Sequence, residues 1–254
     1  DLPSAALNVL TLGCFFLAVT GFAQGHGGWW LLLPAAIGLP LGWLFVRRQL
    51  SRSMPLLPID LLRIPIFALS ICSSISAFTA QMLAMVSIPF YFQHALGLNA
   101  IHTGLLMTPW PLATMFTAPL AGRLLERYHA GLLGGIGMLL FAGGLWGLAS
   151  LPDRPGFALI LSWMMLCGAG FGLFQSPNNH TIITAAPLHR SGGASGMLST
   201  ARLVGQTCGA ALVALMFNLF ADNGTHVALL VASTFAVMAA VVSTLRVSQS
   251  ARRA

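Results

Sequence analysis

The sequence predicts an all-α, polytopic membrane protein with eight transmembrane helices. Hydrophobic residues make up 57% of the chain and charged residues only 7%, whereas soluble domains carry about 25% charged residues. Eight apolar runs are long enough to cross a hydrocarbon core about 30 Å thick. They lack the short alternating pattern of barrel strands, so helices are the structure that satisfies their backbone in lipid.

The eight runs follow one another with short gaps. They cover residues 5–24, 29–46, 66–92, 102–122, 131–151, 157–185, 193–220 and 226–245. In the fourth run, Pro109 and Pro111 flank Trp110 and predict a bending point. The sixth run contains Pro177, and we extend its helix to about Ala185 because neighbouring helices can satisfy a carbonyl freed by proline.

The distribution of arginine predicts the orientation. The chain has no lysine, and its net charge of +7 comes from twelve arginines and five acidic residues. These arginines lie in gaps between apolar runs, which follows the positive-inside rule and argues against a nucleic-acid face. With cytoplasmic N- and C-termini, only Arg154 falls outside, and Arg202 lies near the inner end of the seventh run. The inner loops and the inner C-terminal tail then hold Arg47, Arg48, Arg52, Arg63, Arg123, Arg127, Arg190, Arg246, Arg252 and Arg253.

The cysteines predict no metal or disulfide chemistry. Cys14, Cys72, Cys167 and Cys208 each lie inside an apolar run, without CxxC spacing or a histidine at ligand spacing. We therefore expect buried, inert thiols and neither a metal nor a cofactor. The chain starts at Asp1 without a basic segment or a small-residue cleavage site, so we expect a fragment or processed product rather than a signal peptide.

The gap at residues 49–65 is the longest and divides the chain. Three prolines surround apolar leucines there, which predicts a cytoplasmic amphipathic connector. Residues 1–48 then form two transmembrane helices, and residues 66–254 form a six-helix bundle with a short basic tail. The six helices can be split three and three, as in transporter half-domains built from inverted repeats.

The loop after the fourth run carries the strongest motif. Gly122, Glu126 and Arg127 resemble the signature loop of the major facilitator superfamily. A glycine allows close helix approach, and the carboxylate and arginine can pair with each other or with a helix end. We expect these three residues to form a cytoplasmic gating loop. His129 and Ala130 replace the later glycine and basic residue of the pattern, so a plain charged turn stays the alternative.

Other stretches extend the resemblance over essentially the whole chain. They are RRQLS at 47–51, PLLPIDLLRIP at 55–65, QMLAMVS at 81–87 and the segment 168–184. Together they resemble the fourteen-helix drug:proton antiporter branch of that superfamily, and within it exporters of the methyl viologen resistance type. The resemblance implies that the first two helices are the extra central pair and that the last six are the C-terminal bundle. It also implies a bacterial inner-membrane protein whose N-terminal six-helix half is missing from this chain.

The function that this resemblance implies is efflux of lipophilic cations in exchange for protons. Expected substrates are methyl viologen, quaternary ammonium biocides and cationic dyes. Such a cavity needs aromatic and methionine side chains together with carboxylates. None of the five acids lies in the middle of a run, so we expect the proton-carrying carboxylates in the missing half. The acids are Asp1, Asp60, Glu126, Asp153 and Asp222.

The candidates for one wall of the cavity come from the third, fourth and sixth runs. They are Phe78, Gln81, Met82, Met85, Trp110, Phe174, Gln175 and Asn178. Gln81 and Met85 share a helix face, as do Phe174 and Asn178. Amide side chains are costly in lipid, whereas Met and Phe more often face lipid or a neighbouring helix. His180 could relay protons, but a structural hydrogen bond is the better interpretation.

Several other functions were weighed. A transporter of a siderophore or metabolite would suit the amide-rich sixth run equally well, and a non-transporting membrane remnant is also compatible with the chain. An intramembrane enzyme is disfavoured, since the sequence has no HExxH, no paired aspartates within a run and no matched Ser/His pair.

Overall fold

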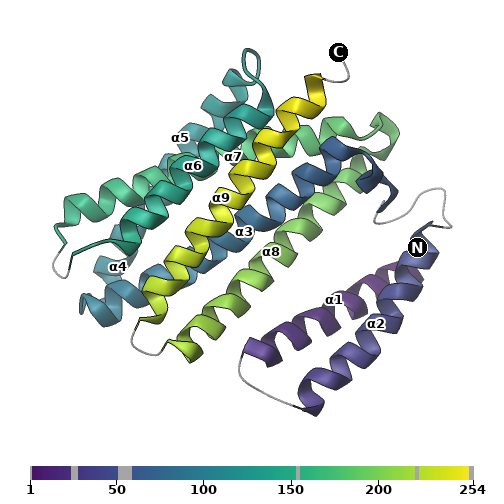
Figure 1. Cartoon of the computed structure of the whole chain (residues 1–254), viewed down its shortest axis with the longest axis horizontal. Helices are drawn as coiled ribbons and strands as arrows, with labels where there is room; N and C mark the ends of the chain where they lie inside the picture. The colour runs from purple at the N-terminus through teal and green to yellow at the C-terminus, as the bar shows by residue number, and fades with distance from the viewer. Residues whose placement is uncertain (1, 24–27, 51–58, 153–154, 221–222, 252–254) are drawn as a thin grey trace.

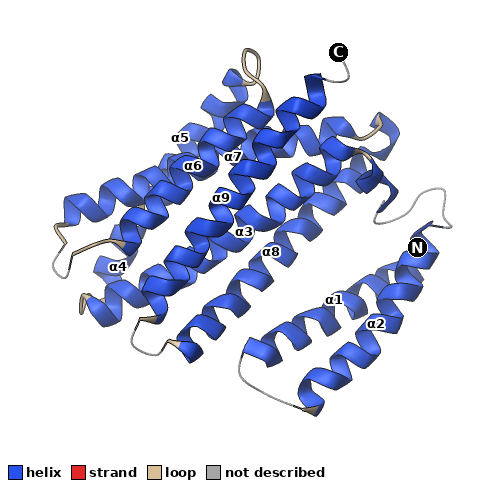
Figure 2. Ribbon diagram, viewed as in Figure 1, coloured by secondary structure: helices blue, strands red, loops and turns tan. Residues whose placement is uncertain are grey.

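A computed structural model describes residues 2–23, 28–50, 59–152, 155–220 and 223–251. Within these ranges the chain forms helices and their connections and no strand (Figure 2). The α-helices are α1 (Leu2–Ala23), α2 (Trp29–Leu50), α3 (Pro65–Phe90), α4 (Ala100–Met107), α5 (Pro109–Leu124), α6 (Ala130–Ala149), α7 (Phe157–Ala185), α8 (Ser191–Leu219) and α9 (Gly224–Ala251). Short helical turns are η1 (Ile59–Arg63), η2 (Tyr91–Ala95) and η3 (Leu188–Arg190).

The helices have the length and composition of a membrane protein. In the described part of the chain, five segments are long and apolar enough to cross a membrane. They are Pro65–Ala95, Ala130–Ala149, Phe157–Ala185, Leu188–Leu219 and Gly224–Val247. The all-helical membrane class is therefore confirmed. The number of eight spans stays a prediction, because α1 and α2 contain only shorter apolar stretches and the fourth run is interrupted.

Proline positions account for the interruption and for the long sixth helix. Helix α4 ends at Met107 and α5 begins at Pro109, which lacks an N–H and suits the first position of a helix. Thr108 lies between them and donates its hydroxyl to the Gly104 carbonyl at 2.9 Å. The helix is thus interrupted beside the predicted bending point, while Thr108 itself keeps α-helical dihedrals, and the bend stays a prediction. Helix α7 continues through Pro177 to Ala185, as predicted.

Two expectations are wrong. Arg246 was placed in the C-terminal tail, but α9 extends to Ala251 and the Arg246 side chain is only 2% exposed. The helix continues because no proline or glycine follows Val247 to end it. Cys72 was expected to be buried, but it lies on the exposed side of α3.

Helix α3 lies at the centre of the bundle. It packs against α8 on one side and α9 on another, while α6 packs against both α7 and α9, and α5 packs against α7. In Figure 1 the α1–α2 hairpin lies beside α8, at the edge of the bundle. Residues 51–58 of the predicted connector lie outside the described residues. Its last part forms η1, which buries Leu61 against α3 and α8.

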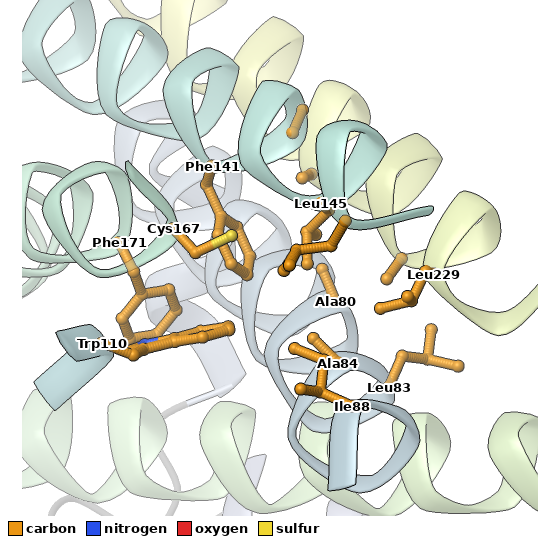
Figure 3. Packing of buried hydrophobic residues seen from close by; sticks show 14 of the residues in the cluster. Ala80, Leu83, Ala84, Ile88, Trp110, Phe141, Leu145, Cys167, Phe171 and Leu229 are labelled. Carbon is orange, nitrogen blue, oxygen red and sulfur yellow. The ribbon is translucent and has the colours of Figure 1, made fainter. Parts of the chain in front are cut away.

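An aromatic layer ties four helices together. Phe141 of α6 lies edge-on to Trp110 of α5 at 5.3 Å and to Phe171 of α7 at 5.6 Å. Phe171 in turn contacts Phe78 of α3 at 5.5 Å. These edge-to-face contacts favour a defined packing of rings beyond simple burial. Figure 3 shows Trp110, Phe141 and Phe171 converging beside the aliphatic side chains of α3.

Glycines allow the helix backbones of α6 and α7 to touch. A Cβ on Gly137 would lie 2.7 Å from the Gly170 carbonyl oxygen, and a Cβ on Gly170 would lie 2.5 Å from the Gly137 carbonyl oxygen. Gly168 and Gly172 approach α5 equally closely. Such contacts matter in lipid, where burial of apolar surface gives no drive for helix association.

We predict that Gly137→Leu strongly destabilises the protein, because a larger side chain would overlap the α7 backbone. Overpacking typically costs about 1–3 kcal/mol or more. Gly143→Leu on the same helix is the control, since a Cβ there meets nothing within 4 Å. Thermal unfolding of the detergent-purified protein should show a clear drop in melting temperature for Gly137→Leu only. Equal melting temperatures would refute close packing at Gly137.

Candidate functional site

The predicted cavity residues fall into a buried and an accessible group. Gln81, Met82 and Gln175 are half-buried, and Met85 is 39% exposed. The side chains that are 4% exposed or less are Phe78, Trp110, Phe174 and Asn178. These four belong to the packed interior of the bundle in this conformation. Their role in contacting a substrate stays a prediction.

Three of the predicted cavity residues are buried aromatic side chains, namely Phe78, Trp110 and Phe174. Two further aromatic residues, Phe141 and Phe171, connect them. Phe171 contacts both Phe78 and Phe174, with ring centroids 5.5 Å and 6.4 Å apart, and Phe141 contacts Trp110. Phe141 and Phe171 were not predicted, although Phe171 lies three residues before Phe174 on the same helix. The structure therefore brings the aromatic candidates together as one layer behind the accessible group.

One of the accessible candidates on α3 lies against α8. Met82 borders Gly209 of α8, where an added Cβ would come within 2.7 Å of the Met82 Cβ. Gln81 and Met85 are one turn apart and offer an amide and a thioether on one face of α3. Both the amide and the thioether are uncharged, and both can contact a planar organic ligand.

Asn178 belongs to a buried polar cluster that the sequence analysis did not predict. The cluster consists of Ser70, Ser74, Asn178, Ser243 and Arg246. Asn178 Oδ1 accepts a hydrogen bond from Arg246 Nη1 at 2.7 Å, and its Nδ2 donates to Ser74 Oγ at 2.6 Å. Arg246 also donates to Ser70 Oγ at 3.0 Å. The Arg246 cluster thus connects α3, α7 and α9 through one guanidinium.

A fourth helix joins the cluster through Ser243. The Ser243 hydroxyl accepts from Arg246 Nη2 and donates to the Gly131 carbonyl of α6 at 3.0 Å. Gly134 of α6 leaves the space that the guanidinium occupies, because a Cβ there would lie 3.1 Å from Arg246 Nη2. Burial of a charged group is costly unless hydrogen bonds satisfy it, and the cluster provides these bonds.

The sequence did contain a signal for this cluster. Ser70 and Ser74 are four residues apart, and Ser243 is three residues before Arg246, so each pair occupies one helix face. Small hydroxyl side chains on one face of an apolar helix indicate a polar partner in a neighbouring helix. The signal was missed because the eighth run was ended at residue 245.

Arg202 is a second arginine within a membrane helix. Its guanidinium lies over the Phe78 ring, 5.2 Å from the ring centroid, which is the geometry of a cation–π contact. The side chain is half-buried, and its Nε is buried without a hydrogen-bond partner in the described part of the chain. Arg202 therefore differs from Arg246, which makes several hydrogen bonds.

An ion pair connects two turns that are far apart in the sequence. Arg190 of η3 holds Asp60 of η1 through both guanidinium nitrogens, with Arg190 Nη2 and Asp60 Oδ1 2.8 Å apart. The paired arginine stabilises the ionised carboxylate and lowers the pKa of Asp60 below its ordinary value of 3.8. This contact fixes the connector before α3 to the turn between α7 and α8.

In the predicted gating loop, Gly122 lies in the last turn of α5, and Glu126 and Arg127 lie in the turn that follows it. Glu126 and Arg127 are exposed, and neither takes part in an ion pair within the described residues. Gly122 faces Ser176 of α7, with 3.9 Å between an added Cβ and the Ser176 hydroxyl. The structure thus places the loop beside α7. Its role as a gate stays a prediction, as does a role for His180, whose side chain is exposed.

We predict that Asn178→Leu and Arg246→Met are each destabilising and are coupled. Each single change leaves a buried polar group short of a partner, which costs about 1–3 kcal/mol. The double variant removes both partners, so its loss should be smaller than the sum by about 1 kcal/mol or more. The free energies of unfolding of wild type, the two single variants and the double variant are measured in detergent, with Asn179→Leu as a control. Additive losses would show that the two side chains do not interact.

We predict that the Asp60–Arg190 pair is lost at acidic pH. Because the folded pKa of Asp60 is lowered, the pair is complete above the ordinary pKa and disappears as pH falls through the lowered value. At neutral pH, Asp60→Asn should raise amide hydrogen exchange at residues 59–64 and 188–192. Glu126→Gln should not. Unchanged exchange in Asp60→Asn would contradict a structural role for the pair.

Comparison with known proteins gives the family. A sequence profile described as the Major Facilitator Superfamily matches residues 66–253. The chain is 61% identical to an uncharacterized transporter of Escherichia coli, YebQ, over all 254 residues and 56% of that protein. It is 31% identical to the multidrug resistance protein Stp of Mycobacterium tuberculosis, over 84% of this chain and 40% of Stp.

A third relative has a named substrate. The chain is 27% identical to the tetracenomycin C resistance and export protein of Streptomyces glaucescens, over 82% of this chain and 39% of that protein. The chain spans about half the length of the curated relatives it matches. The profile covers most of the chain, and the relatives agree with it. The chain therefore belongs to the Major Facilitator Superfamily.

Proposed function

We propose that this chain forms the C-terminal part of a proton-coupled exporter of lipophilic cations in the bacterial inner membrane. In this proposal α1 and α2 are the extra central pair of a fourteen-helix transporter, and the α4–α5 pair forms one interrupted span. Both ends of the chain then lie in the cytoplasm. The proposed exporter is of the methyl viologen resistance type, with quaternary ammonium biocides and cationic dyes as further substrates.

The observation that carries the proposal is the similarity to multidrug exporters within the superfamily. The 31% identity to the multidrug resistance protein Stp covers 84% of this chain, so it is not confined to one motif. A multidrug efflux pump of Mycolicibacterium smegmatis, LfrA, is 27% identical over 76% of the chain. Efflux of drugs therefore recurs among the relatives.

The surface of the bundle supports a role as one wall of a pathway. In α8 only 28% of the most apolar segment is buried, compared with 67% in α6. The accessible amide and thioether groups Gln81, Met82 and Met85 lie on α3, and Met82 lies against α8. An amide that faced lipid would be costly, so Gln81 is better accommodated beside water or protein.

The chain itself offers no carboxylate for proton transfer within its membrane helices. Asp60 lies in η1 and is paired with Arg190, and Glu126 lies in the turn after α5. The remaining acids, Asp1, Asp153 and Asp222, lie before α1 or between helices in the sequence. The proton-carrying carboxylates of the proposed antiporter are therefore assigned to the rest of the transporter.

A second candidate is transport of another organic molecule. The riboflavin transporter RibZ of Clostridioides difficile is 27% identical to the chain, over 56% of the chain. A neutral, planar substrate would also suit the accessible amide group at Gln81. The two candidates differ in whether the substrate carries a positive charge.

The test uses the intact transporter in a drug-sensitive host that lacks its main exporters. We predict energised efflux of ethidium or methyl viologen that a protonophore abolishes. Gln81→Ala and Met85→Ala should reduce efflux several-fold at equal expression, since each removes an accessible contact on α3. Met238→Ala is the matched control, because Met238 is an exposed methionine on α9, at 53% exposure, and is not among the predicted cavity residues.

Each result decides between the candidates. Loss of efflux in the α3 variants alone supports the proposed wall. Equal loss in Met238→Ala would count against that placement. A well-expressed protein without efflux of either cation would transfer the substrate assignment to the neutral or metabolite class.

A further inference from the structure

Arg202 lies in the first half of α8, where its side chain contacts Phe78 of α3. It is eleven residues beyond Ser191, which corresponds to about 16 Å along the helix axis. Its guanidinium stacks on the ring of Phe78, and Phe171 of α7 makes an edge-to-face contact with the same ring. Arg202 therefore contacts the aromatic layer through Phe78. Gln81 and Met82 follow one turn after Phe78 on the same face of α3.

The charge of Arg202 is not balanced within the described residues. The side chain makes no hydrogen bond or ion pair there, and its Nε is buried without an acceptor. Stacking on Phe78 provides a partial compensation. A desolvated cation normally requires an anion and hydrogen-bond acceptors as well. Arg202 thus differs from Arg246, whose guanidinium donates to Ser70, Asn178 and Ser243.

Neither of the two acidic residues that the structure describes supplies the anion. Asp60 is held by Arg190, and Glu126 lies in the turn after α5. The three other acids lie at helix ends in the sequence. The chain nevertheless covers only 56% of the E. coli relative that it matches along its whole length. A transporter of that length would place further helices against this bundle.

We propose that Arg202 forms an ion pair with a carboxylate contributed by the part of the transporter outside residues 1–254. The proposal rests on the proposed function in one respect, that this chain is the C-terminal part of a longer transporter. Arginine suits this contact because its planar guanidinium binds both oxygens of a carboxylate. The two terminal nitrogens would provide the two donors, and Phe78 would hold the guanidinium plane.

The ion pair has two consequences for export. It neutralises a positive charge that would otherwise repel a cationic substrate from the wall formed by Gln81 and Met85. It also makes the contact between the two parts of the transporter sensitive to protons, because a protonated carboxyl no longer attracts Arg202 strongly. Entry of a proton would then loosen the two parts at mid-helix depth.

The experiment measures carboxyl reactivity in the full-length transporter in native membranes. Dicyclohexylcarbodiimide modifies protonated carboxyl groups in apolar surroundings, and peptide mass spectrometry identifies the modified residue. Removal of an opposite charge raises a carboxyl pKa by about 1–3 units. Arg202→Gln should therefore increase labelling of one acidic residue outside residues 1–254 about tenfold or more at neutral pH. Arg202→Lys should give a smaller increase, and Arg127→Gln should give none.

The outcomes separate the proposal from its alternatives. Unchanged labelling of every acid outside residues 1–254 overturns it, as does a gain confined to Asp60 or Glu126. Loss of co-purified anionic lipid in Arg202→Gln, with unchanged labelling, would assign the anion to a lipid phosphate instead. If Arg202→Gln does not accumulate, Arg202→Lys and wild type are compared across pH, and labelling should begin at lower pH in wild type. No substrate is added, so this result is independent of whether the transporter exports cations.

Discussion

Gly137 of α6 and Gly170 of α7 allow two helix backbones to come into direct contact, and the other interior features depend on that contact. In lipid, helices associate through close packing and hydrogen bonds rather than through burial of apolar surface. Once α6 and α7 are this close, Phe141 and Phe171 meet edge to face. The same helix provides Gly134, whose missing side chain leaves the space for the Arg246 guanidinium. A larger residue on this face of α6 would displace both the aromatic layer and the polar cluster.

The two arginines within the membrane helices illustrate how a charge is handled in an apolar surrounding. Arg246 is buried and donates hydrogen bonds to three helices, so its charge stabilises one arrangement of α3, α7 and α9. Arg202 is half-buried and stacks on an aromatic ring. We regard the first as a structural element. The second lies on the surface that we assign to contact with the rest of the transporter. The Asp60–Arg190 pair, in contrast, joins two turns at the ends of helices.

The amino-acid sequence predicted the helices well because long apolar runs have one structural solution in lipid. It predicted a bending point beside the interruption at Thr108 and the continuation of α7 through Pro177, since proline acts locally. It did not predict the Arg246 cluster, because its members come from α3, α7 and α9 and a run boundary was placed one residue too early. The pairing of Asp60 with Arg190 joins residues 130 positions apart, and nothing in the local sequence indicates it. Among the cavity candidates, Phe174 and Asn178 are buried, whereas Gln81 and Met85 are accessible. Residue spacing in the sequence does not distinguish these two groups.

The central claim is that the side of α3 carrying Gln81 and Met85 lines a water-accessible pathway, whereas the outer side of α9 faces lipid. The most direct test introduces one cysteine at a time into the full-length transporter, after replacement of Cys14, Cys72, Cys167 and Cys208. A membrane-impermeant maleimide is then applied to Met85→Cys and to Met238→Cys in oriented vesicles. The account predicts that Met85→Cys is labelled and that a transported cation slows its labelling, while Met238→Cys is not labelled. Labelling of Met238→Cys alone, or equal labelling of both, would contradict it.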